Sequence, residues 1–74
     1  MSQTKTPIRL RLNGADYDSD TGNLAELLIR QGLKLEQKGI AVAQNGKIVA
    51  KTRWSETLIR SGDELEILVA IQGG

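Results

Sequence analysis

Residues 64–74 read Glu64-Leu65-Glu66-Ile67-Leu68-Val69-Ala70-Ile71-Gln72-Gly73-Gly74, an alternating segment that ends in two glycines. Apolar residues at positions 65, 67 and 69 alternate with positions 64, 66 and 68, which is the period of a half-buried β-strand. Gly73 and Gly74 then add no side chains, and glycine has little preference for any one backbone conformation. Fully extended, residues 71–74 reach roughly 13 Å. We therefore expect an anchored strand followed by a flexible tail that carries a carboxylate at Gly74.

A partner for this strand lies near the N-terminus. Residues 8–12 (Ile-Arg-Leu-Arg-Leu) alternate in the same way. Asn13-Gly14 is typical of a two-residue hairpin turn, so we expect a β-hairpin from Lys5 to Asp18. Residues 1–6 are polar and are expected to be loose.

A helix is predicted from Asn23 to Gln31. Leucines at positions 24, 27 and 28 fall on one helical face. Asp20, Thr21 and Asn23 are candidates for its N-terminal cap, and Thr21 is favoured. Gly32 stands where a glycine often ends a helix.

The rest of the chain predicts a second hairpin and two turns. Strands are expected at Ile40–Gln44 and at Lys47–Val49, on either side of an Asn45-Gly46 turn. We expect an irregular or 3₁₀ turn at Thr52–Thr57 and a tight turn at residues 61–63 that leads into the last strand.

This order of elements predicts an α+β fold, a β-grasp, in which a mixed sheet of four to five strands packs on one main helix. We expect residues 1–74 to form a single domain and the last strand to pair parallel with the first. That pairing places Arg9 and Arg11 on the same outer face as Glu64 and Glu66, where opposite charges stabilise the sheet.

Composition excludes several classes of function. The chain has no cysteine and no histidine, which removes disulfides, thiol nucleophiles and Cys/His metal sites. A net charge of +1 and only two aromatic residues, Tyr17 and Trp54, do not favour nucleic acid or an anionic membrane. Asp16, Asp18 and Asp20 lack the register of a calcium loop and are expected to form a solvated edge. With no signal peptide or membrane-spanning stretch, a cytoplasmic location is expected.

Several stretches of the chain together form a family pattern: Asn13-Gly14 with the helix 24–28, residues 40–49, Arg53-Trp54, Gly62-Asp63, Leu65-Glu66-Ile67 and Ala70-Ile71-Gln72-Gly73-Gly74. In these stretches the chain resembles the ThiS family of ubiquitin-like sulfur carriers in thiamine biosynthesis. The likeness covers nearly everything after Thr6, and its most specific part is the C-terminal portion. The chain departs from the family at Lys51-Thr52, where members often carry Pro-Arg directly after the valine, so a slightly different turn is expected.

The resemblance implies a protein substrate that carries sulfur for partner enzymes, and not an enzyme. An adenylyltransferase similar to ubiquitin-activating enzymes would use ATP and magnesium to activate the carboxylate of Gly74. A persulfide donor, of the cysteine desulfurase or rhodanese type, would convert it to a thiocarboxylate. That group would supply sulfur to thiazole synthase. The chain itself is expected to bind no cofactor and no metal.

Partner contacts are expected beside the activated carboxylate. Gly73 keeps the tail thin enough for a narrow channel, and Ile71 and Gln72 lie between sheet and tail. Leu68 points outward and is interpreted as a docking residue. Trp54 is interpreted as structural, burying a small satellite cluster, and Asp63 as a turn residue.

Two other functions remain open at this point. The small subunit of molybdopterin synthase shares this fold and the Gly-Gly ending. A ubiquitin-like modifier or interaction module would instead conjugate its tail to lysines. The Arg53-Trp54 spacing and Gln72 favour the thiamine carrier over the molybdopterin subunit.

Overall fold

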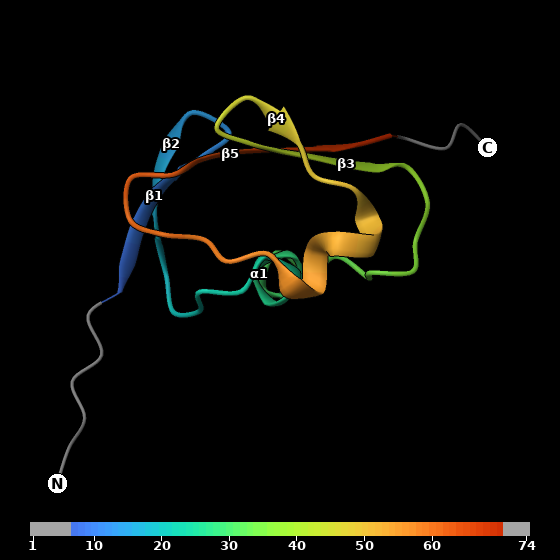
Figure 1. Cartoon of the computed structure of the whole chain (residues 1–74), viewed down its shortest axis with the longest axis horizontal. Coiled ribbons are helices and arrows are strands. Elements are labelled where there is room, and N and C mark those ends of the chain that lie inside the picture. The colour runs from blue at the N-terminus through green and yellow to red at the C-terminus, as the bar shows by residue number, and fades with distance from the viewer. Residues whose placement is uncertain (1–6, 71–74) are drawn as a thin grey trace, which may run out of the picture.

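The computed structural model describes residues 7–70, which are drawn in colour in Figure 1. The expectations for residues 1–6 and 71–74 lie outside this range. In chain order, the elements are β1 (Ile8–Leu12), β2 (Ala15–Ser19), α1 (Leu24–Arg30), β3 (Ile40–Gln44), β4 (Lys47–Ile48), the 3₁₀ helix η1 (Lys51–Glu56) and β5 (Glu64–Val69).

Within residues 7–70, the strands form one five-stranded mixed sheet in the order β2-β1-β5-β3-β4. The helix α1 and η1 lie on the same side of this sheet (Figure 1). β5 runs parallel to β1 and antiparallel to β3, so the last strand occupies the centre of the sheet. The predicted α+β class and β-grasp arrangement are confirmed.

Both predicted Asn-Gly turns are present. Asn13 and Asn45 have φ angles of 51° and 53°, and the glycines that follow them have φ angles of 85° and 83°. Positive φ at both central residues is the geometry that matches the twist of a two-residue hairpin. The turns therefore set the register in which β1 meets β2 and β3 meets β4.

The charges on the outer face pair differently from the prediction. Arg11 lies opposite Glu64 in the β1–β5 register, with its Nε 4.0 Å from the carboxylate, as expected. Arg9 instead donates to both carboxylate oxygens of Asp18, at 2.8 and 3.1 Å. The reason is register: the antiparallel hairpin places Arg9 directly opposite Asp18, while Glu66 lies beyond β1 and opposite Ala43.

The helix begins at a different cap from the one favoured. Asn23 is the N-cap, because its Oδ1 accepts a hydrogen bond of 3.0 Å from the Glu26 N–H. Thr21, the favoured candidate, lies outside the helix. Its hydroxyl accepts from the Asn23 N–H and donates to the Glu26 carboxylate. At the other end, Gly32 has a φ of +85°, as the predicted helix stop requires.

The core lies between the sheet and α1. Trp54 is 2% exposed and donates its indole N–H to the Val49 carbonyl at 3.0 Å. It belongs to the main core, so the predicted satellite cluster is wrong. The reason is that η1 packs against α1 and places the indole among the helix leucines. The buried cluster consists of Leu10, Leu24, Ala25, Leu27, Leu28, Val42, Trp54, Ile59 and Leu65.

Candidate functional site

The candidate site is the end of β5, where the sheet leads into residues 71–74. Of the predicted site residues, the structure describes Leu68 alone. Ile71, Gln72, Gly73 and Gly74 lie outside the described residues. The described part of the site is therefore β5 together with the surface around the end of that strand.

β5 is held along both edges. On one side it pairs with β1, and on the other it pairs with all five residues of β3, from Gln44 opposite Leu65 to Ile40 opposite Val69. One residue later, the Ala70 N–H donates to the Gly39 carbonyl at 2.8 Å. Ladder pairing therefore fixes the backbone up to the last described residue.

The two hairpin asparagines add side-chain hydrogen bonds to β5. Oδ1 of Asn13 accepts from the Ile67 N–H at 2.8 Å, and Oδ1 of Asn45 accepts from the Glu64 N–H at 2.9 Å. Their backbone N–H groups donate to carbonyls of the same strand, at Leu65 and Glu64. Each turn thus closes a hairpin and also fixes the central strand.

Asp63 fixes the start of β5. Its carboxylate accepts from the Arg60 N–H and the Gln44 amide at 2.9 Å and from the Asn45 amide at 3.1 Å. Burial raises the pKa of Asp63, but these hydrogen bonds outweigh burial and hold the pKa below its usual value. The predicted turn residue therefore also joins the β3–β4 turn to β5.

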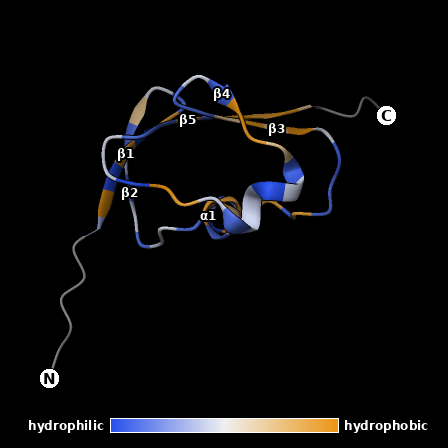
Figure 2. Ribbon diagram, in the orientation of Figure 1, coloured by the Kyte–Doolittle hydropathy of each residue, from blue (hydrophilic) through white to orange (hydrophobic). Residues whose placement is uncertain are grey.

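Leu68 lies on the sheet face opposite α1 and is 69% exposed. Its cross-strand neighbour is Ala41 on β3. Ala43, also on β3, lies opposite Ile48 on β4, and Ile48 is 76% exposed. Figure 2 shows the hydrophobic stretches of β3 and β5 running side by side. We call Ala41, Ala43, Ile48 and Leu68 the apolar face.

Sequence reasoning missed Ile48. The signal was present, because the Asn45-Gly46 turn sets a register in which residue 48 must share a face with Ala43. Because β4 is only two residues long, it has no alternation of apolar and polar residues from which the outward position of Ile48 could be predicted.

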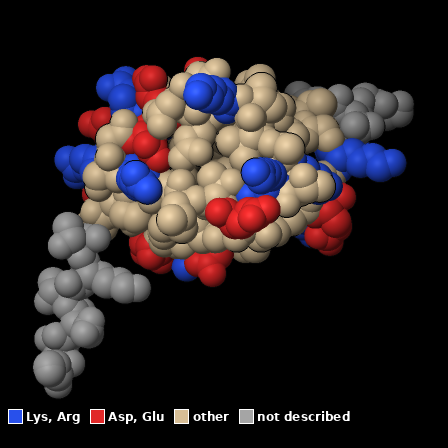
Figure 3. Space-filling view, in the orientation of Figure 1, with Lys and Arg blue, Asp and Glu red and all other residues tan. Residues whose placement is uncertain are grey.

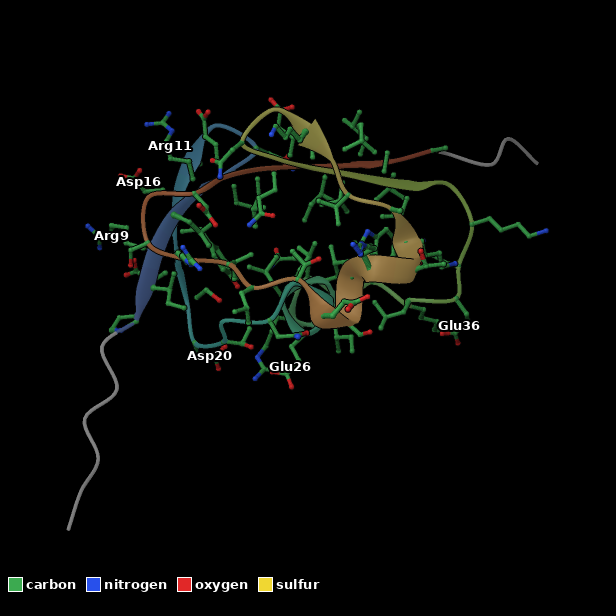
Figure 4. All side chains as sticks on the ribbon, in the orientation of Figure 1. Arg9, Arg11, Asp16, Asp20, Glu26 and Glu36 are labelled. Carbon is green, nitrogen blue, oxygen red and sulfur yellow. The ribbon has the colours of Figure 1, made fainter. Side chains whose placement is uncertain are left out.

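The other half of the outer face is charged. Arg9 and Asp18 pair across β1 and β2, and the hydrogen bond from Arg9 holds the pKa of Asp18 below its usual value. Figure 4 shows Arg9, Arg11 and Asp16 together at this end of the sheet. Figure 3 shows acidic and basic side chains gathered over the same strands. The outer face is thus divided into a charged half and the apolar face beside the end of β5.

Two of the three alternate aspartates, Asp18 on β2 and Asp20 after it, pair with arginines. Besides Asp18 with Arg9, Asp20 accepts from Arg30 at 2.9 Å. Among residues 7–70, no group of three metal-ligating side chains comes together. Across the same range, no helix combines the length and apolar composition needed to cross a membrane.

Comparisons with known proteins agree with one another. The model of the ThiS family matches residues 10–74. The sulfur carrier protein ThiS of Bacillus subtilis is 36% identical over 67 residues, which cover 88% of this chain and 98% of that protein. A crystal structure of the thiamine biosynthesis protein ThiS from Geobacter metallireducens superposes with a TM-score of 0.73 at 26% identity and covers 90% of this chain and all of that one.

A longer protein also contains a similar region. The thiazole synthase of Paramagnetospirillum magneticum is 30% identical over 67 residues. The match covers 90% of this chain but spans only 20% of the length of that protein.

Proposed function

This chain belongs to the ThiS family, and from that premise we propose that it is a sulfur carrier of thiamine biosynthesis that bears sulfur on the carboxyl group of Gly74. The observation that carries the proposal is the family match, which runs to residue 74 and so includes Gln72-Gly73-Gly74. The similarity to the Bacillus carrier over nearly its whole length supports the same function.

The chemistry follows from what the chain offers. It has no cysteine, so no side-chain thiol can hold sulfur. A C-terminal carboxyl group has a pKa of about 3.3–3.7 and is ionised at neutral pH. A carboxylate oxygen attacks the α-phosphorus of ATP, magnesium pyrophosphate leaves, and an acyl-adenylate forms. The outer sulfur of a persulfide then displaces AMP, and a thiol cleaves the S–S bond to release the thiocarboxylate.

Three classes of partner are needed. An adenylyltransferase of the ubiquitin-activating type supplies the ATP and magnesium site, and a persulfide donor of the cysteine desulfurase or rhodanese type supplies the sulfur. A thiazole synthase accepts the sulfur. The Paramagnetospirillum thiazole synthase supports this last partner, because one fifth of its length is covered by the match to this chain. The proposal places all of these steps in the cytoplasm and gives this chain the role of substrate.

The sheet contributes the docking surface. The apolar face lies beside the end of β5, and its two largest members, Leu68 and Ile48, are mostly exposed. Burying such side chains against a partner contributes about 1.5–3 kcal/mol each. We assign partner docking to this face and delivery of the carboxyl group to residues 71–74.

The test is mass spectrometry of the C-terminal peptide after incubation with ATP, magnesium, the adenylating partner and a persulfide. We expect one oxygen to be replaced by sulfur, and fragmentation to place it on Gly74. Isolating the peptide is necessary because oxidation of Met1 changes the intact mass almost equally. An unmodified tail, with a partner that modifies a control carrier, would refute the proposal.

Gly73→Val tests the requirement for a thin tail. Among the described residues, the buried cluster ends at Leu65, so we expect an unchanged unfolding midpoint for this variant. The branched side chain should block entry to the catalytic channel and abolish adenylation, measured as pyrophosphate release. Normal adenylation of this variant would contradict the steric argument.

A further inference from the structure

Gly39 and Ala70 meet at the point where β3 begins and β5 ends. The Ala70 N–H donates to the Gly39 carbonyl at 2.8 Å, one residue beyond the last pair of the β3–β5 ladder. Figure 1 shows the end of β5 beside the first residues of β3 at this corner of the sheet, where Val69 lies opposite Ile40. This hydrogen bond is the last one that the described backbone makes before residue 71.

Two independent features require glycine at position 39. Its φ is +87°, a conformation that side chains disfavour. A Cβ built on it would lie 3.1 Å from the Cβ of Ala70 and 3.6 Å from the Ala70 backbone N and O. Of the six glycines in residues 7–70, Gly39 makes the closest approach of this kind.

The segment before Gly39 is itself fixed. The Gln37 N–H donates to the Lys34 carbonyl at 3.0 Å, and the Gln37 side-chain oxygen accepts from the Lys34 N–H at 2.9 Å. Nζ of Lys51 donates to the Gln37 carbonyl at 3.4 Å. The Gly39 carbonyl, which accepts from the Ala70 N–H, therefore follows an ordered turn, and a hydrogen bond joins this turn to η1.

We propose that Gly39 is a positioning residue for the activation of Gly74, in that it fixes the backbone from which residues 71–74 continue. This rests on the proposed function. Once the apolar face has docked, a fixed Ala70 confines the search of the carboxyl group to the region of the partner's active site. Releasing Ala70 lowers the effective concentration of the carboxylate there.

The experiment compares Gly39→Ala with Gly32→Ala in the full chain. Gly32 is a matched control, because it follows α1, its φ is +85° and a Cβ added there meets nothing within 4 Å. Both variants carry the same backbone strain, but only the first disturbs Ala70. The readouts are hydrogen exchange of the Ala70 amide and the kcat and KM of acyl-adenylate formation with the adenylating partner.

For Gly39→Ala we expect the Ala70 amide to lose protection while the Ile67 amide, held by Asn13, keeps it. We expect kcat to fall about tenfold, within the hundredfold that a misplacement of about 1 Å can cost. KM should change by less than about twofold, because docking through the apolar face is retained. Gly32→Ala should leave kcat, KM and Ala70 protection at wild-type values.

Two further variants separate the contact from the strain. Gly39→Ala combined with Ala70→Gly removes the Cβ clash but keeps the strained φ, so it should recover most of the lost kcat. Ala70→Gly alone provides its baseline. If Gly39→Ala does not fold, Ala70→Pro replaces it, because proline deletes the N–H donor without altering Gly39. It should lower kcat in the same way.

Equal kinetics for Gly39→Ala and Gly32→Ala, or no rescue in the double variant, would overturn the positioning role and leave sulfur carriage intact. Failure of the wild-type chain to be adenylated would instead refute the proposed function. In that case the exchange data still decide whether Gly39 holds Ala70.

Discussion

Among single residues, Asp63 fixes the start of β5, the strand that leads to the site. It is partly buried and accepts hydrogen bonds from the backbone of Arg60 and from the side chains of Gln44 and Asn45. Hydrogen bonds to a charged group contribute about 1.5–3 kcal/mol. Its charged form is therefore part of what holds the start of β5 in place.

Asp63 predicts a dependence of stability on pH. Its pKa is lower in the folded chain than the value of about 3.9 expected when unfolded. The stabilisation is therefore present above about pH 4 and is lost as pH falls through the folded pKa. Urea unfolding should show Asp63→Asn to be less stable at pH 7 by about 2 kcal/mol and to lose less stability on acidification. An unchanged pH dependence in Asp63→Asn, relative to the wild-type chain, would contradict this.

Leu68 predicts a binding effect without a folding effect. Leu68→Ser should raise the KM for the adenylating partner about tenfold, because a docked leucine contributes at least about 1.5 kcal/mol. As Leu68 is 69% exposed, the free energy of unfolding should change by no more than about 0.5 kcal/mol. Leu58→Ser is the control, with 64% exposure outside the apolar face, and should leave KM unchanged. An equal rise in both variants would show that the effect is unspecific.

At the scale of elements, β5 is stabilised by segments from both halves of the chain. The parallel β1 and the antiparallel β3 flank it, and each hairpin turn sends an asparagine side chain to its backbone. The turns that close the hairpins are thus the same residues that fix the strand leading to the site. Backbone conformation and hydrogen bonding can be separated by substitution.

Asn13→Gly keeps the positive φ but removes the acceptor for the Ile67 N–H, so it should cost about 1 kcal/mol. Asn13→Ala loses the acceptor and also replaces asparagine, which tolerates positive φ, by alanine, which does not, at a further cost of about 1–2 kcal/mol. Urea unfolding midpoints measure both. Asn45→Gly should cost more than Asn13→Gly, because Asn45 also donates to Asp63. The reverse order would show that the two turns do not hold β5 as described.

At the scale of the whole molecule, a small core supports every feature of the site. A domain of 74 residues has a free energy of unfolding of about 4–11 kcal/mol. The buried leucines of α1 join Trp54 and the inner face of the sheet in one cluster. Loss of one such side chain removes a large fraction of the total.

Leu27→Ala tests this margin. Leu27 is 0% exposed, and truncating a buried leucine costs about 2–5 kcal/mol. Ile29→Ala is the control on the same helix, because Ile29 is 51% exposed and should cost less than about 1 kcal/mol. Urea unfolding followed by Trp54 fluorescence measures both. Similar losses in the two variants would place the core elsewhere.

Local patterns in the sequence were sufficient to predict the secondary-structure elements and the family. Alternation in residues 8–12 and 64–69, the helical spacing of the leucines and the two Asn-Gly turns are local signals that depend on neighbours a few residues apart. They predicted the strands, α1 and the parallel pairing of β1 with β5, all of which are confirmed. They were weaker for the helix cap, where three polar residues within four positions compete and the structure selects Asn23.

Apart from the pairing of β1 with β5, the contacts between distant segments depended on the tertiary structure. The pairing of β5 with β3, the partner of Arg9 and the grouping of Ile48 with Leu68 depend on registers between strands far apart in the chain. The same is true of the contact between Gly39 and Ala70, where a missing Cβ makes room for the backbone that leads to the tail. Such contacts arise from packing in three dimensions, and no periodicity within a single segment encodes them.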